Sequence, residues 1–135
     1  MSLIQIAYVS RPFGYDASAL AGILVDARAR NREDDVTGAL ICRADLYCQL
    51  LEGPEQAVQA CFSRIARDDR HLEVRKLASL PISHRLFPGW DMRHDPAESW
   101  MWSREETAAG QVETATENDI LMVFRKLAAG RGAPE

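Results

Sequence analysis

Residues 46–54 read Leu46-Tyr47-Cys48-Gln49-Leu50-Leu51-Glu52-Gly53-Pro54, and this stretch decides the fold. The mostly apolar run over 46–52 predicts a strand, because short runs of this kind that are bounded by glycine and proline are typical of strands. Tyr47, Gln49 and Leu51 share one face of that strand, since successive side chains alternate between faces. Gly53 and Pro54 end the strand, and a proline suits the first position of the helix that follows.

Outward from this stretch, strands and helices follow in a regular order. The polar segment Arg43-Ala44-Asp45 suits a hairpin between the strand at 46–52 and one before it. Two helices each carry one apolar stripe with the i, i+3, i+4, i+7 spacing. The predicted elements are a strand at 3–10, a helix from Asp16 or Ser18 to about Asn31, strands at 36–42 and 46–52, a helix from Pro54 to about residue 67, and strands at 74–82 and 87–92.

This β-α-β-β-α-β-β order predicts an α+β fold of the ferredoxin-like kind, in which two helices cover one face of a mixed five-stranded sheet. Beyond it, 118–129 predicts an amphipathic helix, and 98–110 can form another. We therefore expect residues 1–95 to form one domain and 96–135 to form a C-terminal helical extension, with no separate output domain. The apolar residues of this short extension favour a dimer or a larger homo-oligomer.

Composition argues against several classes of function. The net charge of −4 disfavours nucleic acid as a partner, because phosphate binding needs a clustered basic surface. No apolar segment approaches the roughly 18 residues that cross a bilayer, and residues 1–5 lack the features of a signal peptide, so we expect a cytoplasmic protein without membrane contact. The cysteines and histidines lack the spacing of a metal site, and no catalytic motif is present. An enzyme is the first alternative, but it has no catalytic constellation to rest on.

Three polar residues fall among apolar neighbours. Tyr8 shares a strand face with Ile4 and Ile6, Gln49 lies on the strand at 46–52, and Asn31 ends the first helical stripe. A buried polar group without a partner costs about 1–3 kcal/mol, so each of the three should have one. The partners can be local, with Asn31 as a helix C-cap. Alternatively, the three converge on a polar ligand in a groove against the sheet.

Six local strings follow one another over residues 3–93, and in this order and spacing they resemble the BLUF family, sensors of blue light using flavin. The strings are Ile6-Ala7-Tyr8-Val9-Ser10, Ala29-Arg30-Asn31, Val36-Thr37-Gly38-Ala39-Leu40, Tyr47-Cys48-Gln49-Leu50-Leu51-Glu52-Gly53-Pro54, the pair Arg64-Ile65 with Asp68-Asp69-Arg70-His71, and Ile82-Ser83-His84-Arg85-Leu86-Phe87-Pro88-Gly89-Trp90-Asp91-Met92.

The resemblance implies a cofactor and the residues that hold it. FAD is the expected flavin, with FMN and riboflavin as alternatives. Asn31 would hydrogen-bond the pyrimidine edge of the ring, Ile23 and Ile65 would sandwich the ring, and Gln49 would lie between the ring and Tyr8. The other implied contacts with the ring edge, ribityl chain or phosphates are Arg64, Asp68, Arg70 and His71, with Arg64 as the best candidate for phosphate.

The resemblance also implies a blue-light photoreceptor and not an enzyme. Light-driven transfer of an electron and a proton from Tyr8 would rearrange the hydrogen bonds of Gln49 and produce a reversible red-shifted state. Trp90 and Met92 would compete for the place next to Gln49 and pass the change to the C-terminal helices; Ser10 lies near Tyr8 on the first strand. The receiver would be an unidentified signalling protein or an oligomer interface.

Three positions depart from the family pattern. Asp35 stands where glycine is usual, so its turn must either avoid a positive φ or use the tolerance of aspartate for it. Cys48 replaces a larger apolar residue beside Gln49. Ala27 stands where many members carry a hydroxyl near the flavin, which removes one hydrogen bond. Ala27 therefore keeps a second alternative open, a BLUF-derived interaction module without flavin photochemistry.

Overall fold

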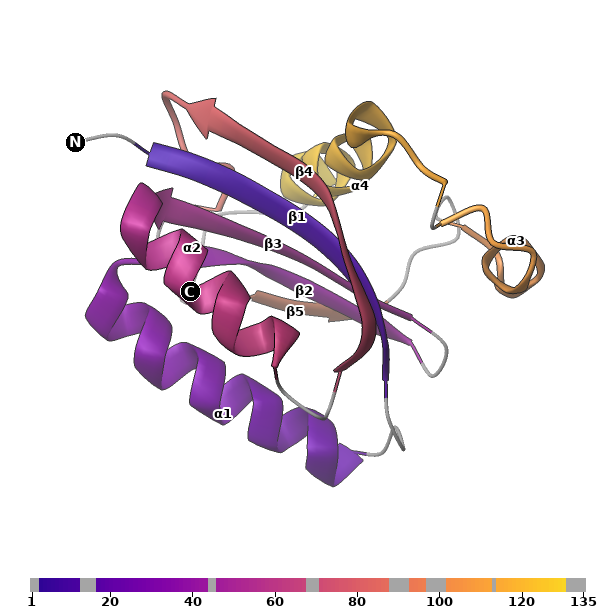
Figure 1. Cartoon of the computed structure of the whole chain (residues 1–135), viewed down its shortest axis with the longest axis horizontal. Helices are drawn as coiled ribbons and strands as arrows, with labels where there is room; N and C mark the ends of the chain where they lie inside the picture. The colour runs from indigo at the N-terminus through magenta and orange to yellow at the C-terminus, as the bar shows by residue number, and fades with distance from the viewer. Residues whose placement is uncertain are drawn as a thin grey trace.

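The computed structural model describes residues 3–12, 17–43, 46–67, 71–87, 93–96, 102–112 and 114–130. Strands and helices are interspersed along the first two thirds of the chain, and two helices are the last elements (Figure 1). The elements are β1 (Leu3–Pro12), α1 (Ala17–Asp34), β2 (Thr37–Arg43), β3 (Leu46–Pro54), α2 (Glu55–Ala66), β4 (His71–Ile82), β5 (Arg93–Pro96), α3 (Arg104–Ala108) and α4 (Glu117–Gly130).

The strands form one sheet in the order β4-β1-β3-β2-β5. The four long strands pair with one another in antiparallel fashion, and the short β5 adds to β2 in parallel as the last strand of the sheet. Helix α2 packs against β1, β3 and β4, and α1 lies beside α2 (Figure 1). The predicted α+β class is confirmed, with a four-stranded antiparallel sheet at its centre.

The predicted strand at 87–92 is wrong at the end that the structure describes. Phe87 lies in a bend before β5, which begins only at Arg93; residues 88–92 lie outside the described part of the chain. The physical reason is a side chain on another strand. The main-chain N–H of Phe87 donates to Glu52 Oε1 at 2.6 Å, so this N–H is taken by a carboxylate and not by a neighbouring strand.

Helix α1 continues to Asp34, three residues past the end predicted at Asn31. Asn31 is therefore not the C-cap. Its carbonyl accepts the main-chain N–H of Val36 at 2.9 Å, and Asp35 between them has a φ of 59°. This is the helix end in which a left-handed residue lets the chain fold back on the last turn, a role that glycine usually fills. Aspartate tolerates this conformation better than most residues, so the second of the two alternatives for Asp35 holds.

The sequence Thr37-Gly38 at the start of β2 has a steric explanation. A Cβ at Gly38 would collide with the main-chain carbonyl oxygen of Leu50 on the paired strand β3. Glycine is therefore needed here because two backbones approach closely. At the far end of β3, Pro54 is the last strand residue and the N-cap of α2, one position before the predicted one.

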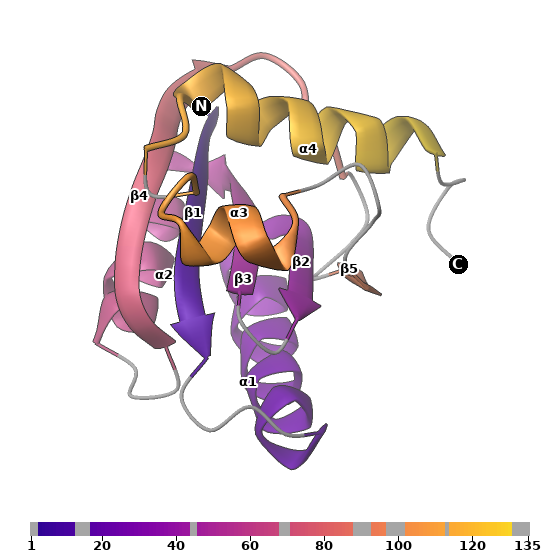
Figure 2. The ribbon, with the colours of Figure 1, turned by 90° about the vertical axis from the view of Figure 1, so that its right-hand side faces the viewer.

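Both faces of the sheet are buried. On one face, a cluster that includes Ile6, Tyr8 and Leu51 packs against α2. On the other face, Ala7, Val9, Ala39, Cys48 and Leu50 pack against α4, which crosses the sheet in Figure 2. The apolar side of α4 comprises Ile120, Leu121, Val123, Phe124 and Leu127, all buried.

The burial of α4 removes one sequence-based argument. The apolar residues of the extension were expected to favour a homo-oligomer, but the structure places the large ones of α4, apart from the exposed Met122, in the core of the same chain. Their hydrophobic character is accounted for without a second copy. None of the helices that the structure describes has the length and apolar character needed to span a bilayer.

Candidate functional site

Tyr8 and Gln49 form a buried pair on neighbouring strands. They are directly opposite each other in the β1–β3 register, and the Tyr8 hydroxyl donates a hydrogen bond to Gln49 Oε1. Tyr8 is fully buried and Gln49 is 2% exposed. Both side chains point to the α2 face of the sheet, as the alternation along each strand predicts. The sequence-based prediction that the Tyr8 hydroxyl lies inside is confirmed.

Asn31 brings a third polar side chain into the interior. It lies on α1 and is 1% exposed. Cys61 Sγ of α2 donates to Asn31 Oδ1 at 3.6 Å, so the amide is held at the contact between the two helices. Burial raises the pKa of the Cys61 thiol, although the nearby Arg64 guanidinium opposes this. The thiol therefore keeps its proton at neutral pH and can act as the donor.

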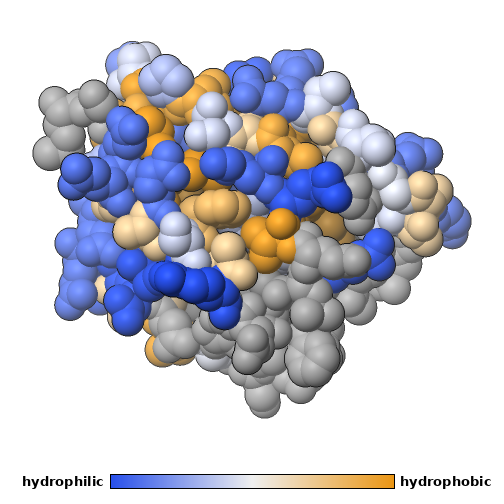
Figure 3. Space-filling view, in the orientation of Figure 1, coloured by the Kyte–Doolittle hydropathy of each residue, from blue (hydrophilic) through white to orange (hydrophobic). Residues whose placement is uncertain are grey.

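An apolar wall surrounds these polar groups. The Phe62 ring meets the Tyr8 ring edge to face, with centroids 5.6 Å apart and planes at 64°. Phe62 and Ile65 are only partly buried, and hydrophobic residues remain visible between hydrophilic ones on this side of the molecule (Figure 3). The α2 side of the sheet thus offers apolar side chains beside two buried carboxamides.

Arg64 lies at the rim of this region. Its Nη2 atom is 3.4 Å from Asp34 Oδ2, in an ion pair between α2 and the end of α1, and the two side chains are 31% and 38% exposed. A partly exposed guanidinium at a helix contact can reach an anionic group from solvent. Ser10 is buried on β1, on the face of Tyr8 and opposite Tyr47.

Several predicted site residues lie outside what the structure describes. For Ile23 and His71 only the backbone is described, in α1 and in β4. The residues outside the described ranges are Asp68, Arg70, Trp90 and Met92. Their predicted contacts stay predictions.

The residues present fit a flat heteroaromatic ligand with hydrogen-bonding edges. Asn31 and Gln49 each carry both donors and an acceptor, which a uracil-like ring edge can match. The wall formed by Phe62, Ile65 and Val58 supplies the apolar contact that most of such a ring requires. Within the described ranges, no three His, Cys, Asp or Glu side chains are grouped as metal ligands.

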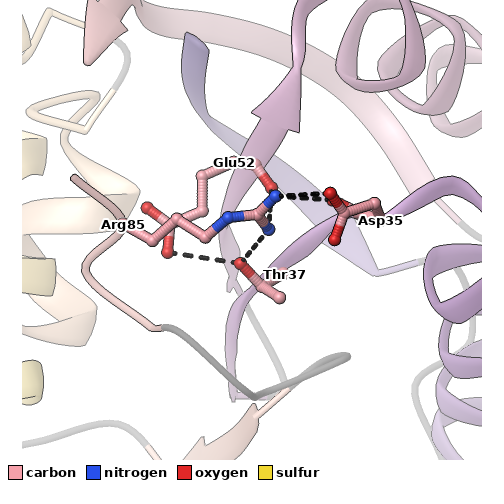
Figure 4. A network of polar contacts seen from close by, with 4 residues as sticks. All are labelled: Asp35, Thr37, Glu52 and Arg85. Atoms are coloured by element: carbon pink, nitrogen blue, oxygen red, sulfur yellow. Dashed lines mark hydrogen bonds and ion pairs between the residues drawn. The ribbon is translucent and has the colours of Figure 1, made fainter. Parts of the chain in front are cut away.

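A second polar cluster lies on the opposite face of the sheet, and the sequence-based predictions did not include it. Glu52, Thr37, Arg85 and Asp35 form the network in Figure 4. The sequence did contain a signal. Strand alternation places Glu52 on the face of Cys48 and Leu50, and a carboxylate on an apolar strand face needs partners.

The comparison with known protein families agrees with this site. Residues 3–93 match the model of the BLUF family, described as sensors of blue light using FAD. The chain belongs to the BLUF family. The cofactor of this family is FAD, and a BLUF domain is a sensor module that is not itself catalytic. The resemblance seen in the six sequence strings is confirmed.

Individual relatives support the assignment. The chain is 33% identical over 87 residues to photoactivated adenylate cyclase subunit beta of Euglena gracilis, which covers 64% of this chain and 10% of that protein. It is 41% identical over 51 residues to the blue light- and temperature-regulated antirepressor BluF of Escherichia coli, covering 38% of this chain and 13% of that protein. The chain thus spans about a tenth of the length of these curated relatives.

The fold has solved counterparts. The dark-state structure of BlrB, a BLUF protein, superimposes with a TM-score of 0.79 at 27% sequence identity. This match covers 96% of the present chain and 98% of BlrB. The match extends well beyond residue 93, so the similarity includes the C-terminal helices as well as the part that the family model covers.

Proposed function

We propose that this BLUF protein is a blue-light receptor in which the Tyr8–Gln49 pair is the switch. The observation that carries the proposal is the buried hydrogen bond from the Tyr8 hydroxyl to Gln49 Oε1, on the face of the sheet that α2 covers. Asn31 lies in the same interior region. A tyrosine, a glutamine and an asparagine so placed can link a bound ring to the sheet.

The flavin would be held by residues of α1, α2 and β3. Asn31 and Gln49 would hydrogen-bond the ring, Ile65 would contact its face together with Ile23, and Arg64 would bind phosphate. Asp68, Arg70 and His71 belong to the same proposal through the family pattern. When bound, FAD supplies absorption of blue light and, in its excited state, a strong oxidant.

The chemistry of the chain itself suits a two-state switch. Tyr8 can release an electron and its hydroxyl proton, and the proton already points at Gln49 Oε1. A primary carboxamide has an acceptor end and a donor end, whereas a hydroxyl both donates and accepts. If the Gln49 amide turned over, its NH₂ group could donate to Tyr8. Each orientation would satisfy Tyr8, so the pair has two distinct hydrogen-bonded states.

A change in the hydrogen bonds of Gln49 must be transmitted from the flavin site to an effector. We infer that it passes through the segment between β4 and β5, with Trp90 and Met92 near Gln49, to the C-terminal helices and from there to a separate signalling protein or an oligomer partner. Support for an effector comes from the relatives, whose names describe a light-regulated cyclase and an antirepressor. A local change of hydrogen bonds that biases a two-state element is sufficient for such a switch.

The visible absorption spectrum tests the proposal. We expect purified protein to show flavin bands that shift slightly to the red in blue light and revert in darkness. The Gln49→Leu variant should bind flavin without this shift, because leucine has no amide to rearrange. The matched control is Gln59→Leu, the same change at an exposed position of α2, which should behave like the parent protein. A shift that persists in Gln49→Leu contradicts the switch, and a colourless protein that FAD does not reconstitute contradicts the receptor.

A further inference from the structure

We propose that Glu52 is a positioning residue for signal output. Its buried carboxylate holds residues 85–87 against β3, and through Phe87 it ties helix α4 to the strand that carries Gln49. The light-dependent part of this inference rests on the proposed function. The structural tie between Glu52 and α4 does not.

Glu52 is the centre of the tie because it is a fully buried carboxylate shared between two parts of the chain. Its Oε2 accepts the main-chain N–H of Leu86 at 2.9 Å and the amide of Gln5 at 3.1 Å. Its Oε1 accepts the main-chain N–H of Phe87 at 2.6 Å and the Thr37 hydroxyl at 3.5 Å. Two donors come from the sheet and two from the segment after β4, so the carboxylate joins them directly.

Arg85 adds further contacts between residues 85–87 and the sheet (Figure 4). Its Nη1 donates to Thr37 Oγ1 at 2.8 Å and to the main-chain carbonyl of Glu52 at 3.3 Å. Its Nη2 donates to the main-chain carbonyl of Asp35 at 2.9 Å and lies 3.1 Å from the Asp35 carboxylate. Residues 85–87 are thereby fixed to β2, to β3 and to the end of α1.

Phe87 carries the position of this segment to α4. Its ring meets the Phe124 ring of α4 edge to face, with centroids 6.4 Å apart and planes at 89°. Both rings are almost completely buried. The main-chain N–H of Phe87 donates to Glu52 of β3. The position of the Phe87 ring against α4 therefore depends on β3.

Gln49 and Glu52 lie on the same strand but face opposite sides of the sheet. They are three positions apart, which is about 10 Å along a strand. Strand β3 is paired on both sides, with β1 and with β2, so a displacement at Gln49 moves the strand as a unit. Glu52 would move with it and carry the N–H groups of Leu86 and Phe87. A change in the flavin pocket would thereby reach α4 on the far face.

The test combines Glu52→Gln with hydrogen exchange of the α4 amides, in darkness and under blue light. Glutamine has the same shape but replaces one acceptor oxygen with an NH₂ group, which faces donors it cannot satisfy. We expect α4 amides to exchange about 5- to 100-fold faster in the dark, with α2 unchanged. Under light, the variant should keep the red shift but lose the change in α4 exchange seen in the parent. Glu55→Gln, the same change at an exposed glutamate of α2, is the matched control.

The outcomes separate the two proposals. A purely structural role would speed α4 exchange equally in light and dark and leave the light-induced difference intact, which would overturn the inference. Unchanged dark exchange, or a parent protein whose α4 does not respond to light despite a red shift, would also overturn it. A parent protein without a red shift contradicts the proposed function instead. Hydrogen exchange of the α4 amides in the dark still tests the structural link between Glu52 and α4. If Glu52→Gln does not fold, Phe87→Leu keeps most of the apolar volume and must show the same loss of α4 response with the red shift retained.

Discussion

At the scale of single residues, orientation matters as much as identity. The Asn31 side chain accepts from the Cys61 thiol, and burial keeps that thiol protonated by raising its pKa. The Asn31 amide is therefore oriented from α2 although it belongs to α1. A side chain held in this way loses little further freedom when a ligand binds, which favours tight binding.

Asn31→Ala should weaken flavin binding by about 10- to 100-fold, because one or two hydrogen bonds to the ring would be lost. Equilibrium titration of the flavin-free protein with FAD, followed by fluorescence, measures this. Asn118→Ala on α4 is the matched control, since Asn118 is exposed and should leave the affinity unchanged. Equal affinities for the parent protein and Asn31→Ala would exclude Asn31 as a flavin ligand.

At the scale of elements, the helix ends decide where the strands begin. Helix α1 stops because Asp35 adopts a left-handed φ of 59°, and the chain then enters β2. For an ordinary L-residue this conformation costs about 1–2 kcal/mol, and aspartate only reduces that cost. The Asp35 carboxylate also pairs with Arg85, but Asp35 is 72% exposed, so the pair adds little to stability.

Asp35→Gly should therefore be more stable than Asp35→Ala by about 1 kcal/mol, because glycine adopts a positive φ without strain. Both variants lose the carboxylate and its ion pair, so the comparison isolates the backbone term. Urea denaturation measures the free energy of unfolding of each. Equal stabilities would show that the turn relaxes to a negative φ when the side chain is changed.

At the scale of the whole molecule, the sheet is a central layer with α2 on one face and α4 on the other (Figures 1 and 2). Helix α4 of the C-terminal extension is therefore part of the core. In the proposed signalling route, α4 can therefore respond to a movement of the sheet through direct contact. A signalling partner that binds α4 would need no access to the proposed flavin site.

Phe124→Ala should lower the free energy of unfolding by about 3–5 kcal/mol, as expected for a large aromatic side chain removed from a core. Met122→Ala is the control on the same helix, since Met122 is 41% exposed and its truncation should cost less than about 1 kcal/mol. Chemical unfolding followed by circular dichroism compares them. Similar, small losses for both variants would mean that α4 is not part of the cooperatively folded unit.

The sequence by itself determined the local pattern. Alternation along β1 placed Tyr8 on the inner face with Ile4 and Ile6, and alternation along β3 placed Gln49 with Tyr47 and Leu51; the burial of these residues confirms both predictions. The six strings identified the family and thereby the expected flavin. The predictions from strand alternation succeeded because they depend on neighbours a few residues apart, where the strand period and turn residues act directly.

Only the tertiary structure decided the features that join distant residues. The bend at Phe87 replaced a predicted strand because a carboxylate 35 residues earlier takes its N–H, and no local pattern contains that information. The same holds for α4, whose apolar side is equally suited to a second copy or to the sheet of its own chain. Without α4, the second face of the sheet would expose its apolar residues to water. Packing α4 on this face buries the apolar area of the helix and of the sheet at once.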